Sequence, residues 1–409
     1  MEKKIAVIFE SSPFDRKGLF NAVHQRIAHL LPLGQFSVDA FCLHSRDNAF
    51  TRKVRHNPKV PFKKQVEIDG IKYNLLWYRF SVIDDILVQK LCRRPIFFSR
   101  FVRKTASLLK DYDIVAAHSY EGGLVALEAN RLFGVRYYVT WHGSDIHTRP
   151  WANSLVMRQT SEIARNAVMN CYVSDSLRVI GEKIAPGSAS MVLYNGVSDA
   201  FRTFASGRRM QVRSKFGVSG RKSVGYAGNF HRVKNVLSLP EIFENVASKY
   251  DGPITFWLVG DGKQRKALVD KMLDSAGRME ASVVLPGGKR VGKAAAQVEI
   301  IFWGNVKTEA MPLIMNCLDV LVLPSLNEGC PLVCAEAIMC GAAVAGSDVC
   351  GIPDIIGRDN VAALGEGFAD RLSDIIVNML ENGSSQTIPS RLDWSRTACL
   401  EADMLNGNS

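Results

Sequence analysis

The sequence lacks any apolar run long enough to cross a membrane. No stretch approaches the ~18 consecutive apolar residues that a bilayer-spanning helix needs. The apolar run Ile5–Phe9 stops at Glu10, which makes it too short for the hydrophobic core of a secretory signal. These absences predict a cytoplasmic protein. The chain also has no internal repeat or long low-complexity tract, and 47% of its residues are hydrophobic, enough for sizeable cores.

The nine cysteines include no Cys-x-x-Cys pair, so the common zinc and dithiol motifs are missing. Cys330, Cys334, Cys340 and Cys350 lie close in sequence, but their spacing fits no usual zinc pattern and most have apolar neighbours. We therefore expect reduced thiols, mostly in the core, of an intracellular protein. No metal is expected at these positions.

Acidic residues are scarce in one segment. The net charge of +11 is carried entirely by residues 46–110, where 16 basic residues face 5 acidic ones. Aromatic and aliphatic residues are interspersed, as in Leu76-Trp-Tyr-Arg-Phe80 and Arg93-Arg-Pro-Ile-Phe-Phe-Ser-Arg100. This mixture suits peripheral contact with an anionic membrane. A solvated basic face without a partner remains the alternative, and nucleic acid is not expected because no nucleic-acid motif accompanies the charge.

Short apolar runs alternate with amphipathic helical patterns along the chain, which predicts α/β architecture with parallel sheets. Two such series are separated by the polar stretch Ser198–Arg213, so we expect two Rossmann-like domains facing a central cleft. Residues 1–200 would form the first domain, with residues 390–409 packing back on it, and residues 201–389 the second. Pro286–Gln297, rich in Gly, Lys and Ala, is predicted to be a flexible surface insertion.

The most informative block runs from Leu323 to Gly341. A strand is expected to end at Pro324, and a helix follows, with Pro331 in its first turn and Gly341 just past its end. The amino end of this helix would supply N–H groups and a positive dipole end to an anion such as a diphosphate. Glu336 would accept hydrogen bonds from ribose hydroxyls, and Glu328 would lie on the sugar side.

This block, with Gly-x-Pro after the first of two glutamates separated by seven residues, resembles the signature of family 4 retaining glycosyltransferases of the GT-B fold, which include bacterial polysaccharide and lipopolysaccharide enzymes. The resemblance implies donor binding by Gly329, Cys330, Pro331 and Leu332 beside Glu336, and a catalytic role for Glu328.

Other segments match the family in order. Tyr226-Ala-Gly-Asn-Phe-His-Arg-Val-Lys-Asn235 resembles its glycine turn, with Gly228 at the donor and Arg232 and Lys234 holding the diphosphate. The family usually has Arg directly after the glycine, where this chain has Asn229, so Arg232 is expected to substitute. Leu258-Val-Gly-Asp-Gly262 resembles a second glycine turn, for which a plain tight turn is the alternative. In Phe302-Trp-Gly-Asn-Val306, backbone groups of Asn305 and Val306 would read the nucleobase. Ser347-Asp-Val-Cys-Gly-Ile-Pro-Asp354 resembles the following Gly-Ile-Pro loop.

In the first domain, the family places a His-Gly where this chain has Tyr138-Val-Thr-Trp-His-Gly-Ser-Asp145, and this resemblance makes His142 the main candidate for contact with the transferred sugar or the acceptor. Asp145 would position acceptor groups or serve the turn. His118 resembles a second acceptor-side position, with a structural role as the alternative. Asn195-Gly-Val197 resembles the family's turn near the domain hinge. Gly18 matches an N-terminal glycine loop that often has two glycines, whereas here Lys17 precedes it.

We therefore expect a retaining, metal-independent hexosyltransferase that uses a nucleotide diphosphate sugar, with UDP favoured, and needs no cofactor. The acceptor would be a glycan or a lipid-linked oligosaccharide in cell-surface polysaccharide synthesis, at the inner face of the cell membrane. Asp111-Tyr-Asp113 matches a metal-binding pattern of another transferase fold, but it lies at the amino end of a strand and is expected to be structural. A sugar-nucleotide 2-epimerase and a non-catalytic nucleotide-sugar sensor or inactive partner subunit remain alternatives.

Overall fold

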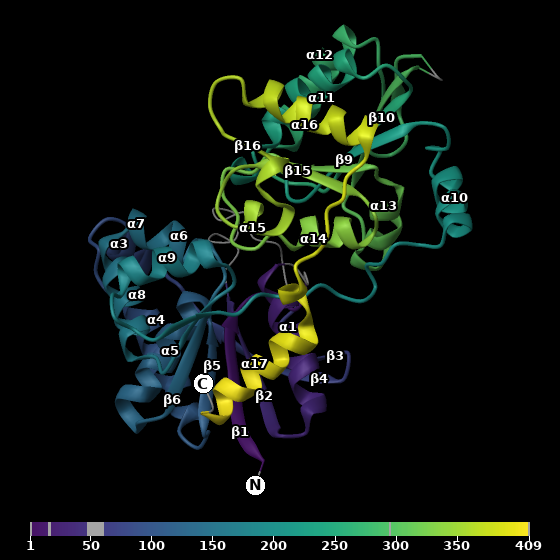
Figure 1. The fold of residues 1–409 in the computed structure, drawn as a ribbon. Coiled ribbons are helices and arrows are strands. Elements are labelled where there is room, and N and C mark those ends of the chain that lie inside the picture. The colour runs from purple at the N-terminus through teal and green to yellow at the C-terminus, as the bar shows by residue number, and fades with distance from the viewer. Residues whose placement is uncertain (1, 15–17, 47–60, 294–295, 408–409) are drawn as a thin grey trace. The chain divides into compact units, whose positions relative to one another are not determined.

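The computed structural model describes residues 2–14, 18–46, 61–293 and 296–407 (Figure 1). The chain divides into two compact units, Met1–Gly196 with Asp393–Ser409, and Val197–Leu392. The expected boundaries lay a few residues away, at 200 and 390. Each unit contains an eight-stranded sheet within the described residues. The predicted α/β fold with two Rossmann-like units is confirmed.

In the first sheet, neighbouring strands are parallel except for the antiparallel edge strand β3. Central strands are buried along their length because helices cover both faces, which explains their continuous apolar runs. The short β3, in which only Ile68 is buried, has no such run and was not predicted. The strands, in order across the sheet, are β3 (Gln65–Ile68), β4 (Ile71–Tyr78), β2 (Phe36–Ser45), β1 (Lys3–Glu10), β5 (Ile114–His118), β6 (Arg136–Trp141), β7 (Asn170–Tyr172) and β8 (Ser190–Val192).

The helices of this unit flank the sheet. One group packs around α5, which contacts β1, β5 and β6 and is itself covered by α4 and α8. Another helix pair, α1 and α17, packs together although the two lie at opposite ends of the sequence (Figure 1). The bounds are α1 (Leu19–Leu30), α3 (Val82–Gln89), α4 (Ile96–Ala106), α5 (Ser119–Phe133), α6 (Ser144–His147), α7 (Arg149–Ala152), α8 (Ser154–Asn166), α9 (Asp175–Ile184) and α17 (Trp394–Asn406).

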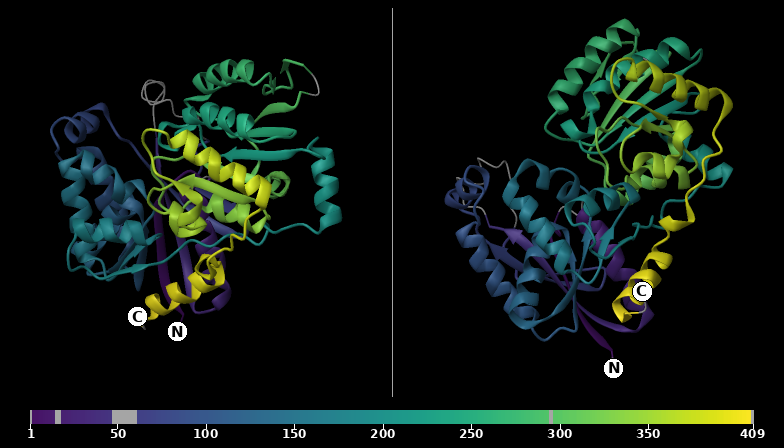
Figure 2. Two further views of the ribbon diagram at one scale, coloured as in Figure 1. Left: turned by 45° about the horizontal axis from the view of Figure 1, so that its top comes forward. Right: turned by 60° about the vertical axis from the view of Figure 1, so that its left-hand side comes forward.

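Helix α17 completes the first unit, and both views of Figure 2 show it ending beside the purple strands of the first sheet. Arg26 of α1 is 2% exposed and pairs with Glu401 of α17 at 3.1 Å. The same guanidinium donates to Asn195 Oδ1 at 3.0 Å. A Cβ on Gly196 would lie 2.4 Å from the backbone nitrogen of Trp394. The Asn-Gly turn that the sequence placed near a hinge therefore receives the start of α17.

The second sheet is parallel except for its edge strand β12. Pro286–Gln297 was predicted to be a flexible insertion, but its described part contains β12, which pairs antiparallel with β11 through Val283 and Val291. Both residues of β12 are exposed, so hydrophobic periodicity does not reveal this strand. The strands, in order, are β12 (Arg290–Val291), β11 (Ser282–Val284), β13 (Val298–Gly304), β10 (Ile254–Val259), β9 (Lys222–Ala227), β14 (Val320–Leu323), β15 (Ala343–Ser347) and β16 (Val361–Ala362).

The helices of the second unit also flank their sheet, and α16 packs on α11 and on β14–β16. The polar stretch Ser198–Arg213 was predicted to be a separator, but α10 begins within it. This helix buries no residue and is attached by polar bonds, such as those of Arg209 Nε to Asn316 O at 3.0 Å and Arg213 to Asp319 at 3.1 Å. The bounds are α10 (Ser206–Lys215), α11 (Leu239–Lys249), α12 (Arg265–Arg278), α13 (Met311–Cys317), α14 (Leu332–Met339), α15 (Ile352–Ile356) and α16 (Phe368–Asn382).

The strand orders decide where side chains gather. In the second sheet β9 lies between β10 and β14, so the strand order reverses beside it, and in the first sheet it reverses beside β1. Ligands of open α/β sheets bind beyond the carboxyl ends of strands at such reversal points. The predicted motifs follow β9, β10, β13, β14 and β15 in one unit, and β5 and β6 in the other, and therefore lie at these edges.

Candidate functional site

Two glycine turns of the second unit pack directly on each other. The Gly228 N–H donates to Val259 O at 3.0 Å. A Cβ on Gly260 would lie 1.9 Å from Gly228 O, and one on Gly262 would lie 2.3 Å from Asn229 Oδ1. The 258–262 turn thus supports the 228–230 loop, and its glycines are required by close backbone approach. This is a structural role, so direct ligand contact is not needed to explain the motif.

The basic pair lies in the 3-10 helix Arg232–Lys234, which is joined to the loop after β14 because the Leu326 N–H donates to Val233 O at 2.8 Å. The structure pairs two predicted site residues directly, since Lys234 Nζ lies 2.5 Å from Glu328 Oε1. Arg232 is exposed, and its side chain has no partner within the described residues. The site therefore offers one paired cation and one free cation.

Glu328 is held in place by further contacts. Its side chain is 10% exposed, and Oε1 also accepts a hydrogen bond from Ser325 Oγ at 2.7 Å. Its backbone carbonyl accepts from the Gly351 N–H at 3.2 Å, and a Cβ on Gly351 would lie 2.2 Å from Gly329 O. The glycine of the predicted Gly-Ile-Pro loop is thus needed so that this loop can pack against the segment carrying Glu328.

Helix α14 begins at Leu332, so Pro331 precedes it rather than lying in its first turn as predicted. The Leu332 N–H turns back onto Cys330 O at 2.9 Å, which is a tighter bend than the expected helical start. Glu336 lies in the second turn, partly exposed, and its carboxylate has no partner among the described residues. Removal from water raises the pKa of Glu336 to about 7. The Glu336 carboxylate is therefore available as a hydrogen-bond acceptor, and its protonated and ionised forms are both populated near neutral pH.

The predicted base-reading residues follow β13. Asn305 is exposed and Val306 is half-buried, and both lie outside the sheet's hydrogen bonding. The preceding Gly304 O accepts from the Gly260 N–H at 2.8 Å. This bond ties the turn after β13 to the glycine turn after β10, so the strand-end loops form one connected edge.

In the first unit, two histidines follow neighbouring strands and meet. His118 ends β5 and His142 follows β6, and His118 Nδ1 lies 3.1 Å from His142 Nε2. Burial, with Arg26 nearby, lowers the pKa of His142 to about 3. Burial lowers the pKa of His118 as well, and His142 and Arg26 lower it further. Both imidazoles are therefore neutral at pH 7, suited to hydrogen bonding with a hydroxyl rather than to contributing positive charge.

Asp145 serves the loop that presents His142. Its buried carboxylate accepts from the Gly143 N–H at 2.7 Å and from the His142 N–H at 3.1 Å. Burial raises the pKa of Asp145, while these two backbone donors oppose the rise. The turn role, one of the two that the sequence allowed, accounts for these contacts. Gly18 is exposed at the start of α1 with φ of 45°, and Lys17 before it lies outside the described residues.

A carboxylate cluster in the same unit was not predicted. Glu10 ends β1 and accepts a hydrogen bond from the hydroxyl of Tyr78, which ends β4. Glu121, in the first turn of α5, pairs with Arg149 at 2.7 Å. Burial, with Glu121 next in effect, raises the pKa of Glu10 well above its usual range. The sequence did contain a signal for this cluster, because Glu10 is a polar residue at the end of a buried strand.

The structure thus places the predicted residues in two sets, one on each unit. His118, His142 and Asp145 form a connected group in the first, and Gly18 lies elsewhere in the same unit at the start of α1. The second set, beyond the strands and at α14, consists of Gly228, Arg232, Lys234, Asn305, Val306, Glu328, Gly329, Cys330, Pro331, Leu332 and Glu336.

Candidate metal ligands are dispersed. Within the described ranges, no three His, Cys, Asp or Glu side chains gather as a metal site would require. Asp113 lies at the amino end of β5, where its carboxylate accepts from the Lys4 N–H at 2.7 Å, a structural contact of the kind predicted for it. Across the part of the chain that the structure covers, no helix has the length and apolar character to span a membrane.

Two models of known protein families match this chain, one in each of the two units. Residues 221–382 match the model described as glycosyl transferases group 1, and residues 22–179 match the glycosyl transferase 4-like domain. Together the two models cover most of the chain.

Three individual proteins that resemble this chain share less than a third of their residues with it over the aligned part. The chain is 27% identical to a 2-deoxystreptamine N-acetyl-D-glucosaminyltransferase of Streptomyces fradiae, over 64% of this chain and 63% of that protein. It is 23% identical to a putative teichuronic acid biosynthesis glycosyltransferase of Bacillus subtilis, over 64% of this chain and 60% of that protein. The matches thus span less than two thirds of either relative. HepE of Anabaena, solved in complex with UDP and glucose, has the same fold, with a TM-score of 0.69, 16% identity, and 99% of this chain and 100% of that chain covered.

Proposed function

Because the chain belongs to the glycosyltransferases that these two family models describe, we propose that it transfers a sugar from a nucleotide diphosphate sugar to a hydroxyl acceptor. One observation carries the proposal. Lys234, Arg232 and Glu328 gather at the carboxyl edge of the second sheet, beside the reversal of its strand order. That edge is where a diphosphate binds in open α/β sheets.

The residues have distinct tasks in this proposal. Breaking the bond between the anomeric carbon and the diphosphate develops negative charge on the leaving phosphate. Lys234 and Arg232 neutralise that charge, together with the N–H groups before α14. Glu336 accepts hydrogen bonds from the ribose, and backbone groups of Asn305 and Val306 contact the base. Glu328 orients Lys234 when the site is empty and faces the sugar when it is filled.

We further propose that the anomeric configuration is retained. The mechanism would be a same-face substitution in which the leaving phosphate helps to deprotonate the acceptor hydroxyl. NMR analysis of the anomeric proton and carbon of the product tests this directly. A product of inverted configuration would exclude the mechanism.

UDP is the favoured nucleotide, supported by the likeness to HepE, whose structure holds UDP and glucose. A thermal-shift panel of UDP-, GDP- and ADP-sugars tests the choice, because a ligand that binds the native state raises its apparent stability. We expect the largest shift with a UDP-sugar, and a reduced shift in Lys234→Met. No shift with any nucleotide sugar would contradict the donor site itself.

Metal independence is part of the proposal, since Lys234 and Arg232 provide the cationic charge that a metal ion supplies in other transferases. Turnover in excess EDTA should equal turnover without it. Loss of activity in EDTA and its return with Mn²⁺ would contradict this assignment.

Turnover assays also distinguish the transferase from two alternative functions. An epimerase would consume donor without acceptor and yield an epimer, and a sensor would bind donor without hydrolysing it.

For the acceptor, we propose a glycan or lipid-linked saccharide at the cytoplasmic face of an anionic membrane, in cell-surface polysaccharide synthesis. The support is an exposed apolar surface on α3, the turn after it and the start of α4. The apolar side chains of this surface are 44–55% exposed. The capping residue Asp84 is buried, and its Oδ1 accepts from the Ile96 N–H at 2.7 Å, fixing the corner between α3 and α4. The surface consists of Val82, Ile83, Ile86, Leu91, Ile96 and Phe97, with Lys90, Arg93 and Arg100 among them.

Binding to vesicles tests the membrane contact. Anionic vesicles should bind the protein at low salt and release part of it as the salt rises, since each basic residue near the surface contributes about 1 kcal/mol. Ile83→Ser should weaken binding, whereas Val168→Ser, an exposed apolar residue beyond α8, serves as the control. Absence of binding to anionic vesicles at low salt would contradict the membrane contact. A water-soluble acceptor, as in the name of the Streptomyces relative, would then be favoured.

A further inference from the structure

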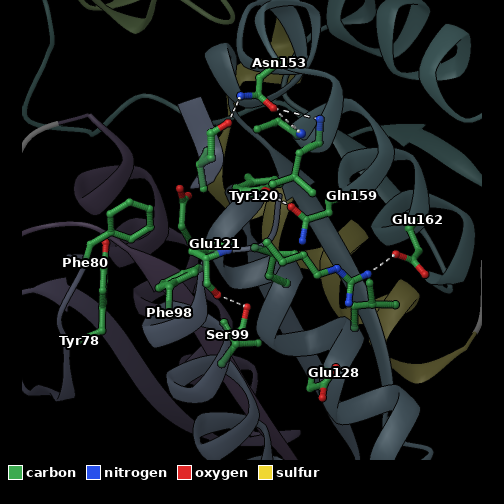
Figure 3. Close-up of a pocket in the computed structure, with 18 of the residues that line it drawn as sticks. Tyr78, Phe80, Phe98, Ser99, Tyr120, Glu121, Glu128, Asn153, Gln159 and Glu162 are labelled. Atoms are coloured by element: carbon green, nitrogen blue, oxygen red, sulfur yellow. Dashed lines mark hydrogen bonds and ion pairs between the residues drawn. The ribbon is translucent and has the colours of Figure 1, made fainter. Parts of the chain in front are cut away.

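The first unit contains a cavity of about 550 Å³ that none of the predicted site residues lines. It is bounded by the segment before α3 and by α4, α5 and α8. Much of its wall is apolar, and Figure 3 shows Phe80 and Phe98 on one side with Gln159 and Glu162 on the other. The apolar lining includes Phe80, Phe98, Val102, Leu124, Leu127 and Val156. This volume suits an organic molecule of moderate size and greatly exceeds that of a phosphate ion.

The polar groups of the wall are largely paired with one another. The Tyr120 hydroxyl donates to Gln159 Oε1 at 2.5 Å, and Arg149 pairs with Glu121 at 2.7 Å. Arg131 pairs with Glu162. Because these groups already have partners, the wall offers a ligand mainly apolar contact in this part of the cavity.

Two cations of the wall differ from the rest. Arg100 and Arg103 lie one turn apart on α4, and both side chains are exposed. Neither forms an ion pair within the described residues, whereas Arg94, Arg131 and Arg149 all do. Two free guanidinium groups on one helix suit a phosphate or diphosphate, which they bind through charge and paired N–H donors.

We propose that this cavity binds the apolar chain of a phosphate-bearing amphiphile, whose phosphate lies against Arg100 and Arg103. This inference rests on the proposed function, in which such an amphiphile is the lipid carrier of a lipid-linked acceptor. A membrane phospholipid shares the same chemistry. Helix α4 connects the two surfaces, because Phe98 and Val102 face the cavity while Ile96 and Phe97 at its start are exposed.

Binding of farnesyl diphosphate to the full chain, followed by isothermal titration calorimetry, tests the proposal. Geranyl diphosphate should bind at least about tenfold more weakly, because each buried methylene contributes to affinity. Inorganic pyrophosphate and farnesol should each bind at least about tenfold more weakly than farnesyl diphosphate, since each lacks one half of the amphiphile. Equal affinity for farnesyl diphosphate and pyrophosphate would overturn the role of the cavity.

Two substitutions with matched controls locate the site. Leu124→Trp on α5 should fill the cavity and reduce farnesyl diphosphate affinity at least about tenfold, whereas Leu132→Trp on the exposed side of α5 should not. Arg103→Gln should weaken binding about threefold to tenfold, whereas Lys104→Gln, on the same helix outside the cavity, should not. Arg103 is exposed, so this variant folds and keeps the test decisive even if Leu124→Trp does not. Wild-type affinity in both Leu124→Trp and Arg103→Gln would refute the proposal.

Two further measurements separate the sources and the two proposals. A lysophosphatidate that displaces farnesyl diphosphate at equal concentration indicates a phospholipid ligand, and failure to displace it indicates the prenyl carrier. In both cases the cavity binds the amphiphile. Nucleotide-sugar thermal shifts should be the same in Leu124→Trp and in the wild-type chain. Donor binding without any binding of farnesyl diphosphate would refute the cavity proposal alone, and absence of donor binding would refute the proposed function.

Discussion

The carboxylate of Glu336 should make donor binding depend on pH in a defined direction. Its pKa is raised from 4.5 to about 7 because the protein removes it from water, and its side chain has no partner within the described residues. An ionised carboxylate accepts two hydrogen bonds from ribose hydroxyls, whereas the protonated form has lost part of that capacity. Affinity for a nucleotide sugar should therefore fall as the pH falls through about 7.

The size of the effect follows from the pKa. If only the ionised form binds, the observed Kd rises in inverse proportion to the fraction of protein that is ionised at Glu336. Between about pH 8 and about pH 6, a pKa near 7 changes that Kd by about tenfold, or about 1.4 kcal/mol. The same raised pKa predicts an effect on stability. The folded state takes up the proton more readily than the unfolded state, so Glu336 destabilises the fold increasingly as the pH rises from 4.5 to about 7.

Calorimetric titration with a nucleotide sugar at several pH values, in wild type and Glu336→Gln, measures the effect. A nucleotide sugar is preferred to the free diphosphate, whose terminal phosphate itself titrates near neutral pH. Glu336→Gln should bind more weakly above pH 7, show a flatter pH profile, and have a higher Tm than the wild type at alkaline pH. A wild-type Kd that is constant over this range, or an unchanged slope in the variant, would refute the role given to Glu336.

Three other changes probe the rest of the structure. Lys234→Met should lower kcat about 100-fold to 1000-fold with a retained circular dichroism spectrum, because it removes a charge from the leaving phosphate; near-wild-type kinetics would contradict the site. Asp145→Ala should reduce the free energy of unfolding by about 1–3 kcal/mol in urea titrations, because two backbone N–H groups lose their acceptor; an unchanged midpoint would contradict this. Gly260→Ala should cost about 3–5 kcal/mol in the same assay, since its Cβ would lie 1.9 Å from Gly228 O. Gly277→Ala, in a helix with open space around it, should be neutral or stabilising and serves as the control.

Much of the fold could be predicted because burial on both faces of a sheet leaves a pattern in the sequence. Strands such as Ile114–His118 and Ile254–Val259 coincide with short apolar runs of the sequence, since all of their positions are buried. The elements that were missed are exposed. Helix α10 buries no residue, and β12 has two exposed residues, so neither has an apolar period.

The candidate site was predictable in part for a similar reason. Polar residues that follow buried strands lie at one edge of a parallel sheet, and Lys234 and Glu328 both do so. Their direct contact was not predictable, because it joins residues 94 positions apart and depends on how two loops pack. Glu10 obeyed the same rule but was read only as the end of an apolar run. Its partners Tyr78 and Glu121 come from elements whose adjacency is fixed only by the strand order.

The pairing of Arg26 with Glu401 has a consequence for protein synthesis. The two residues are separated by 375 positions, so a ribosome must translate nearly the whole chain before the buried arginine of α1 meets its counter-charge. The stretch Val197–Leu392 is uninterrupted and can fold as soon as it leaves the exit tunnel. The docking of α17 on α1, which completes the first unit, therefore follows the synthesis of the second unit. A prematurely terminated chain would retain an unneutralised arginine and an uncovered apolar face on α1, features that chaperones and proteases recognise.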